Sequence, residues 1–218
     1  MKNILCFGDS NTWGFNGEGG ERFPHEQRWT SLLQKNLGPD YNIIPEGING
    51  RTTVWEDPFK PCRNGAAFLP YGLLTHAPLD LVVIMLGTND SKNYFRNSPF
   101  AIGKGIRTLI EMIQVSDAGR GGNVPEILIL SPSPVAPGIQ EKASFDIREF
   151  ADIDGHDPLK VSRGLAAEYR RRADEYGCAF LNAGESAGVC PEDGIHLTAD
   201  GHGGLAKAVA AKIREMGL

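Results

Sequence analysis

Five short apolar runs are spaced along the 218-residue chain, and each of them stops at glycine, proline or polar residues. Runs of about four to eight such residues are typical of strands that are buried on both faces of a sheet. The pattern predicts strands over residues 4–7, 41–45, 79–86, 127–130 and 178–181.

The segments between these runs carry apolar residues at helical spacing. Residues 27–37, for example, place their apolar side chains on one stripe, which ends at Gly38. Helices are predicted over residues 27–37, 66–76, 99–115, 159–176 and 198–216, the last capped by Thr198. Because strands alternate with helices, the sequence predicts the α/β class, with a parallel sheet covered on both faces.

Residues 134–157 interrupt this alternation with a mixture of proline, glycine and charged residues. Loops of this length are commonly functional or mobile, so we expect an inserted loop that acts as a lid, an oligomer contact or both. No repeat or domain boundary is visible elsewhere, and residues 1–218 are therefore predicted to form a single domain.

Net charge, apolar run length and cysteine spacing limit the kinds of molecule that the protein is expected to bind. The formal net charge is −5, which argues against nucleic acid, and no apolar run approaches the about 18 residues of a membrane span. The chain opens directly into a strand without a signal peptide, and its four cysteines lack metal-ligand spacing. The sequence thus predicts a cytoplasmic protein with no membrane partner, no nucleic-acid partner and no bound metal.

Candidate chemistry lies at the ends of three predicted strands. Ser10 follows the first strand, Gly50 the second and Asn89 the third. Parallel strands place these loops at one edge of the sheet, where open α/β sheets bind their ligands. A serine is an effective nucleophile only when a base takes its proton and donors stabilise the oxyanion. We expect the Ser10 and Gly50 N–H groups and the Asn89 amide to be those donors.

The base is predicted just before the final helix. Asp193 and His196 are three residues apart in a turn, so the carboxylate can hold one imidazole nitrogen while the other nitrogen faces a serine. In this arrangement Ser10 attacks the substrate, His196 takes and returns the proton, and Asp193 fixes the tautomer of the imidazole.

Four sequence blocks carry these residues in order along the chain: GDSN at 8–11, GING at 47–50, GTND at 87–90 and DGIH at 193–196. Together they resemble the blocks of the SGNH (GDSL-type) hydrolase superfamily, and the first and third are similar to those of its short intracellular arylesterases and acyltransferases. The resemblance implies a flavodoxin-like, three-layer α/β/α sandwich with a five-stranded parallel sheet. It also implies a serine mechanism without metal or cofactor, acyl-ester substrates and frequent homo-oligomerisation.

The predicted function is therefore that of a serine esterase. It would hydrolyse or transfer short acyl groups from small aryl or carbohydrate esters through an acyl-serine intermediate. Asn11 stands where the family name has leucine, so the acyl preference stays open. The residues expected to contact the substrate are Asn11, Trp13, Asn49 and Ile195, while Trp13 and Trp55 either line a pocket or pack the fold.

Two other residues compete for the catalytic roles. Ser186 lies in a G-x-S-x-G pattern, but the proline and glycine that follow prevent the helix that a nucleophile elbow needs. His202 falls in the first turns of the final helix, where we expect a residue on the helix surface.

Two functions from other classes remain open. A metal-dependent phosphoesterase would use Asp9, Asn89, Asp90 and His196, but the usual D-x-H ligand pair is absent from the first strand. A non-catalytic flavodoxin-like binding module would cradle a phosphate in residues 8–12, where Asp9 would repel the anion.

Overall fold

The computed structural model describes residues 1–218, which are built around one five-stranded sheet. All neighbouring strands are parallel, in the order β2-β1-β3-β4-β5. The strands are β1 (Lys2–Gly8), β2 (Tyr41–Gly47), β3 (Leu81–Met85), β4 (Glu126–Ser131) and β5 (Ala179–Asn182). Each predicted strand is therefore present.

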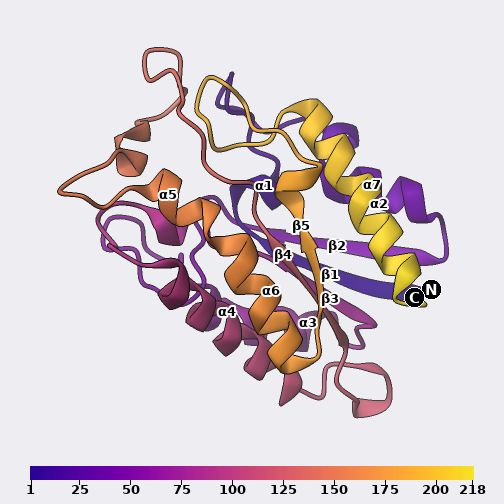
Figure 1. The fold of residues 1–218 in the computed structure, drawn as a ribbon. Helices are drawn as coiled ribbons and strands as arrows, with labels where there is room; N and C mark the ends of the chain where they lie inside the picture. Colours follow the sequence, from indigo (N-terminus) through magenta and orange to yellow (C-terminus); the bar gives the residue numbers. More distant parts are fainter.

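Helices cover both faces of this sheet (Figure 1). Helices α2 (Trp29–Leu37) and α7 (Ala199–Glu215) pack on one face, and α3 (Gly65–His76), α4 (Pro99–Gln114) and α6 (Leu165–Tyr176) pack on the other. The architecture is the predicted three-layer α/β/α sandwich. None of the helices combines the length and the apolar character that crossing a bilayer requires.

Two elements differ from the prediction. The helix expected over 159–176 is divided into α5 (Pro158–Arg163) and α6 at Gly164, where a Cβ atom would lie 2.7 Å from the Pro99 ring. The segment directly after β1 starts with one helical turn, α1 (Ser10–Trp13), which the apolar pattern did not predict.

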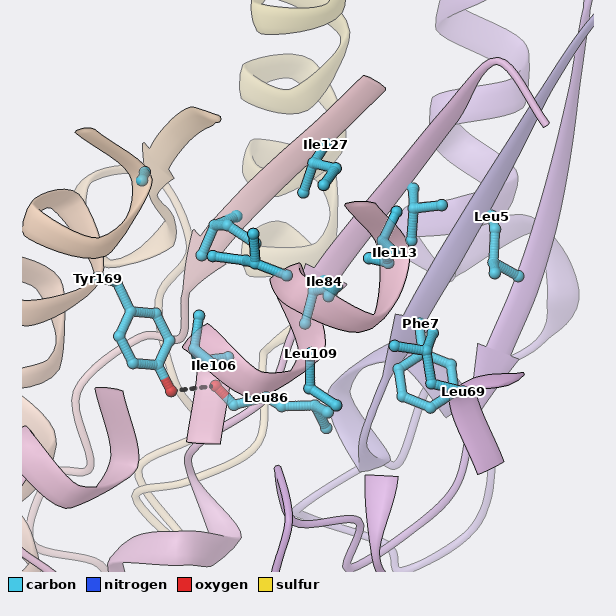
Figure 2. Packing of buried hydrophobic residues seen from close by; sticks show 14 of the residues in the cluster. Leu5, Phe7, Leu69, Ile84, Leu86, Ile106, Leu109, Ile113, Ile127 and Tyr169 are labelled. Carbon is cyan, nitrogen blue, oxygen red and sulfur yellow. Dashed lines mark hydrogen bonds between the residues drawn. The ribbon is translucent and has the colours of Figure 1, made fainter. Parts of the chain in front are cut away.

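The core explains why the strands appear as unbroken apolar runs. Along β1, Leu5 and Phe7 face the α3, α4 and α6 layer, whereas Ile4 and Cys6 face the α2 and α7 layer. All four are at most 1% exposed, so the strand has no polar face. The buried side chains between the sheet and the α3, α4 and α6 layer form one hydrophobic cluster, part of which Figure 2 shows. In this cluster the Tyr169 hydroxyl donates a 2.9 Å hydrogen bond to the Leu86 carbonyl.

The register of the strands brings three loops to the same level. Gly8 at the end of β1 pairs with Gly47 on β2 and with Met85 on β3. The loops that leave these strands therefore begin side by side at one edge of the sheet. The inserted segment 134–157 lies beyond this edge, next to the loop that precedes α7 (Figure 1), and contains one 3-10 turn, η4 (Ile147–Phe150).

Candidate active site

Ser10 begins α1 immediately after β1. Asp9 caps this turn, because its carboxylate accepts a 3.0 Å hydrogen bond from the Asn11 N–H. The cap fixes the backbone at the strand end, where the serine begins the helical turn. Ser10 is only 6% exposed, yet its side chain lines the cavity described below.

A continuous chain of hydrogen bonds joins Ser10 to His196 and Asp193. The Ser10 Oγ lies 2.8 Å from His196 Nε2, and His196 Nδ1 lies 2.7 Å from Asp193 Oδ2. All three residues are buried. If Asp193 accepts from an Nδ1–H group, Nε2 is the acceptor for the serine proton, which is the tautomer that a general base requires.

The turn that carries His196 is itself held by Asp193. Asp193 Oδ1 accepts hydrogen bonds from the backbone N–H groups of Ile195 at 2.8 Å and of His196 at 3.0 Å. From α1, Asn11 Oδ1 accepts a 2.9 Å bond from the Leu197 N–H. Because Asn11 follows Ser10 directly, this bond ties the serine turn to the histidine turn.

Gly50 and Asn89 approach the same point from the loops after β2 and β3. Gly50 has φ +83°, a conformation that other residues adopt only with strain, and its N–H has no acceptor within the protein. The Asn89 amide donates one of its two N–H groups to the Arg51 carbonyl at 3.1 Å. This bond orients the amide and leaves its second N–H free for a ligand.

A cavity of about 170 Å³ opens between these residues. Its apolar wall consists of aromatic and aliphatic side chains, namely Phe15, Phe145, Phe150 and Ile195. The rings of Phe15 and Phe145 lie 4.3 and 5.5 Å from the His196 ring, so they shield the imidazole.

Another part of the cavity wall is polar and charged. The Lys92 ammonium lies 2.8 Å from Glu149 Oε2 and 3.7 Å from the buried Asp57, and Lys60 lies 3.3 Å from Glu149 Oε1. Burial lowers the pKa of Lys92, and the ion pair with Glu149 opposes that shift. Glu149 belongs to the inserted segment, so this ion-pair network also holds the insertion against the cavity.

The root of the inserted segment is attached to the histidine turn through its backbone. The Ala136 N–H donates to the Gly194 carbonyl at 2.8 Å, and the Ile139 N–H donates to the Glu192 carbonyl at 2.9 Å. A Cβ atom at Gly138 would lie 2.5 Å from the Asp193 backbone, and one at Gly194 would lie 1.9 Å from the Ala136 carbonyl oxygen. The two segments are therefore in direct backbone contact.

The structure brings together most of the residues that the sequence singled out. Ser10, Gly50, Asn89, Ile195 and His196 all line the cavity, and Asp193 lies directly behind His196.

Three of the four residues expected to contact substrate are not among those that line the cavity. Asn11 holds the histidine turn, Trp13 packs under the Arg22 guanidinium at 4.7 Å, and Asn49 is not among the lining residues. Trp55 also lies outside the cavity wall and packs close to Gly105 on α4.

His202 departs from the prediction of a helix-surface residue. Its side chain is completely buried, because α7 packs its first turns against the Trp29 end of α2. Ser186, by contrast, follows a 3-10 turn rather than entering a helix, and it does not reach the cavity.

The residues that sequence reasoning missed are the cavity walls: Phe15, Lys60, Lys92, Phe145, Glu149 and Phe150. They come from loops without regular periodicity, so no local pattern marked them. The aromatic residues within the inserted segment were the one available signal, since an exposed loop rarely places such side chains in water.

No group of three or more histidine, cysteine, aspartate or glutamate side chains is arranged to hold a metal ion. One oxygen of each carboxyl group nearest to the strand ends is engaged by the protein, while the second oxygen of each has no hydrogen-bond partner. Asp9 accepts from Asn11, and Asp90 Oδ1 accepts from the Thr53 N–H at 2.9 Å.

Comparison with known proteins agrees with this geometry. The sequence model of the GDSL-like lipase/acylhydrolase family matches residues 6–203. The chain therefore belongs to this family, and the predicted resemblance to SGNH hydrolases is confirmed.

Particular relatives are similar over nearly the whole chain. An acetylxylan esterase from Xylanibacter ruminicola is 27% identical over 97% of this chain, which spans 43% of the length of that relative. A carbohydrate acetylesterase family member from Sinorhizobium meliloti is 41% identical, with a TM-score of 0.91 over 100% of both chains. The M. smegmatis aryl esterase is 39% identical, with a TM-score of 0.87 over 99% of both chains. These structures confirm the fold class.

Proposed function

We propose that the protein is a serine esterase that cleaves short acyl esters of aryl or carbohydrate alcohols through an acyl-serine intermediate. One observation carries this proposal: the buried chain of hydrogen bonds from Ser10 through His196 to Asp193. Membership of the lipase/acylhydrolase family supports it, as do the esterase names of the similar proteins. Neither a metal-dependent phosphoesterase nor a non-catalytic binding module is favoured by these relatives.

In the proposed mechanism, Ser10 Oγ attacks the ester carbonyl carbon while its proton passes to His196 Nε2. Asp193 stabilises the resulting imidazolium through its bond to Nδ1. The proton then moves from Nε2 to the departing alcohol oxygen as the C–O bond breaks. A water molecule, or a second alcohol, repeats the sequence on the acyl-serine and restores the free serine.

The tetrahedral intermediate carries its negative charge on the former carbonyl oxygen. We assign the Ser10 N–H, the Gly50 N–H and the free N–H of the Asn89 amide as the donors to this oxygen. The N–H of the first residue of a helix has no partner within that helix, and the Gly50 N–H has none within the protein. Each donor of this kind has contributed about 3–4 kcal/mol where it was removed from another enzyme.

The volume of the cavity limits the size of the substrate. A volume of about 170 Å³ accommodates a short acyl group or part of a small alcohol, not both a long chain and a sugar. The Phe15 and Phe145 rings suit an aryl alcohol, and the Lys60–Glu149 pair offers a donor and an acceptor to the hydroxyl groups of a carbohydrate. The apolar wall limits water, which supports acyl transfer to added alcohols beside hydrolysis.

The test is hydrolysis of p-nitrophenyl acetate, butyrate and octanoate by the wild type, Ser10→Ala and Ser186→Ala, with and without EDTA. We expect activity to fall with chain length, to be lost only in Ser10→Ala and to be unaffected by chelation. Activity that survives in Ser10→Ala but disappears in Ser186→Ala or with EDTA contradicts the proposal. Added benzyl alcohol should divert part of the acetyl group to benzyl acetate.

We further propose a cytoplasmic, single-domain protein that forms a homo-oligomer. All four cysteines are free, as is usual in a reducing compartment. Tyr71, Leu74 and Val115 expose apolar side chains on and beside α3 and α4, a surface that a second copy would cover. Light scattering should give a mass above the monomer's 23.6 kDa, and a monomer at assay concentration contradicts the oligomer.

A further inference from the structure

Arg51 lies buried beneath the candidate oxyanion donors, and the mechanism above gives it no role. It is 1% exposed, and its guanidinium lies 4.0 Å from the centre of the Phe7 ring. Arginine is rarely this deeply buried unless its charge and donors are engaged. Its contacts are therefore informative about what it holds in place.

The guanidinium joins two strand ends. Arg51 Nη1 donates a 2.9 Å hydrogen bond to the Gly8 carbonyl and another to the Glu46 carbonyl. Gly8 is the last residue of β1, two positions before Ser10, and Glu46 lies in β2, four positions before Gly50. One side chain thus links the ends of the two paired strands whose following loops carry two of the donors.

The backbone of Arg51 reaches the third donor. Its carbonyl accepts the 3.1 Å bond from the Asn89 amide that orients this side chain. Arg51 is also bonded covalently to Gly50. A single residue therefore contacts or adjoins every segment from which an oxyanion donor comes.

The charged groups around Arg51 also connect it with the candidate oxyanion donors. Asp9 and Asp90, the neighbours of Ser10 and Asn89, are buried, and the attraction of Arg51 opposes the rise in the pKa of Asp9. Burial raises the pKa of Asp9 to about 7 and that of Asp90 to about 6. Burial lowers the pKa of Arg51 to about 10, so the guanidinium remains charged at neutral pH. Its charge attracts the buried Asp9 carboxyl group, whose negative charge would otherwise repel a developing oxyanion.

We propose that Arg51 is a positioning residue that holds the Ser10, Gly50 and Asn89 donors in one arrangement around the oxyanion. The proposal rests on the proposed function, because it presumes that these three groups stabilise the oxyanion. A buried arginine with a purely structural role would affect stability and leave the chemical step unchanged. Arg172 on α6 is such an arginine: it is 4% exposed and pairs with Glu168 and Glu175, away from the cavity.

The experiment compares Arg51→Lys and Arg51→Met with Arg172→Met in p-nitrophenyl acetate hydrolysis, with kcat and KM measured separately. We expect Arg51→Met to lower kcat by about 10²–10³ and Arg51→Lys by about tenfold, with KM little changed, as for the loss of oxyanion donors elsewhere. Arg172→Met should lower the melting temperature and leave kcat unchanged. If Arg51→Met fails to fold, Arg51→Lys still decides: a folded Lys variant with the wild-type kcat overturns the proposal.

A double-mutant cycle with Asn89→Ala identifies the route of the effect. Asn89→Ala alone should lower kcat by about 10²–10³. If Arg51 acts by placing Asn89 and its neighbours, the double variant should lose less than the product of the two single losses. Losses that multiply fully overturn the positioning role.

Ser10→Ala is assayed in the same series to separate two kinds of failure. Activity lost in Ser10→Ala but unchanged in the folded Arg51 variants contradicts only the role of Arg51. Activity retained in Ser10→Ala contradicts the proposed function itself.

Discussion

Two buried imidazoles lie six residues apart in the C-terminal part of the chain, one in the turn before α7 and one within its first turns. His196 has hydrogen-bond partners on both nitrogens and faces the cavity. His202 accepts a 3.3 Å bond from the Trp29 N–H at Nδ1, has no partner at Nε2 and packs edge-on against Phe23 at 5.2 Å.

The difference shows that burial alone does not make a histidine a base. At His196, a carboxylate orients the ring and stabilises its charged form, while a hydroxyl supplies the proton. At His202, burial without an acidic partner lowers the pKa to about 4, so the ring stays neutral at the pH where the enzyme would work. We therefore regard His202 as a residue that holds α7 against α2.

The largest expected effect contrasts the two histidines directly. His196→Gln should lower kcat by about 10⁴ or more, because the proton of Ser10 then has no acceptor. His202→Asn keeps an acceptor for the Trp29 N–H and should leave kcat within about threefold of the wild type. Steady-state kinetics with p-nitrophenyl acetate checks both, and similar losses in the two variants would contradict the distinction.

A smaller effect is expected from the carboxylate that distinguishes the two sites. Asp193→Asn removes the acceptor that selects the tautomer of His196 and should lower kcat by up to about 10⁴. The matched control is Glu192→Gln, which changes the neighbouring, half-buried acid on the same turn. If Glu192→Gln lowered kcat as much as Asp193→Asn, the loss would come from removing negative charge near the turn and not from breaking the bond to the imidazole.

The smallest effect concerns stability and belongs to His202. Its pKa is lowered from 6.5 to about 4, so the native state favours the neutral ring. Between pH 6.5 and about 4, His202 binds a proton in the unfolded chain but stays neutral in the native chain. Because protonation then favours the unfolded state, the free energy of unfolding falls as the pH is lowered from 6.5 to about 4. The loss amounts to about 2–3 kcal/mol.

The measurement is the free energy of unfolding by urea at pH 7 and pH 4.5. The fall in this free energy should be smaller for His202→Asn than for the wild type, because the variant lacks the titrating group. The pH-dependent contributions of all other titrating groups are the same in the two proteins, so they cancel when the two falls are subtracted. The exposed His25 provides the control, and His25→Asn should show the wild-type fall.

The strands of the sheet and the candidate catalytic residues at its edge could both be predicted from the sequence, for one physical reason. Strands buried on both faces appear as unbroken apolar runs, and residues that follow such runs must lie at one edge of a parallel sheet. Asp193 and His196 were found because their spacing alone brings the carboxylate to the ring.

The burial of His202 was missed because helical periodicity describes only the helix itself. Whether a polar residue faces a neighbour depends on how closely the two segments approach, and glycine was the available signal. Gly201 and Gly204 lie one position before and two positions after His202, and a Cβ at either would lie 2.3 or 1.9 Å from the backbone carbonyl oxygens of Gly188 and Ser186. The 186–188 segment therefore lies against the first turns of α7, in addition to α2. The polar wall made by Lys92 and Glu149 had no comparable signal, because it joins two loops that are distant in the sequence.

The backbone contact between residues 136–139 and the histidine turn has a consequence for how the sequence of this protein can change. The root of the insertion is fixed to the turn that orients the imidazole, whereas Phe145, Glu149 and Phe150 reach the cavity from further along the same segment. Replacement of residues 140–156 would therefore exchange the part of the cavity wall that the insertion supplies, including the Phe145 ring beside the imidazole, while the backbone contacts to the histidine turn are kept. Deletion that included Gly138 would remove both at once, so insertions and shortenings in descendants of this chain should be confined to the distal part of the loop.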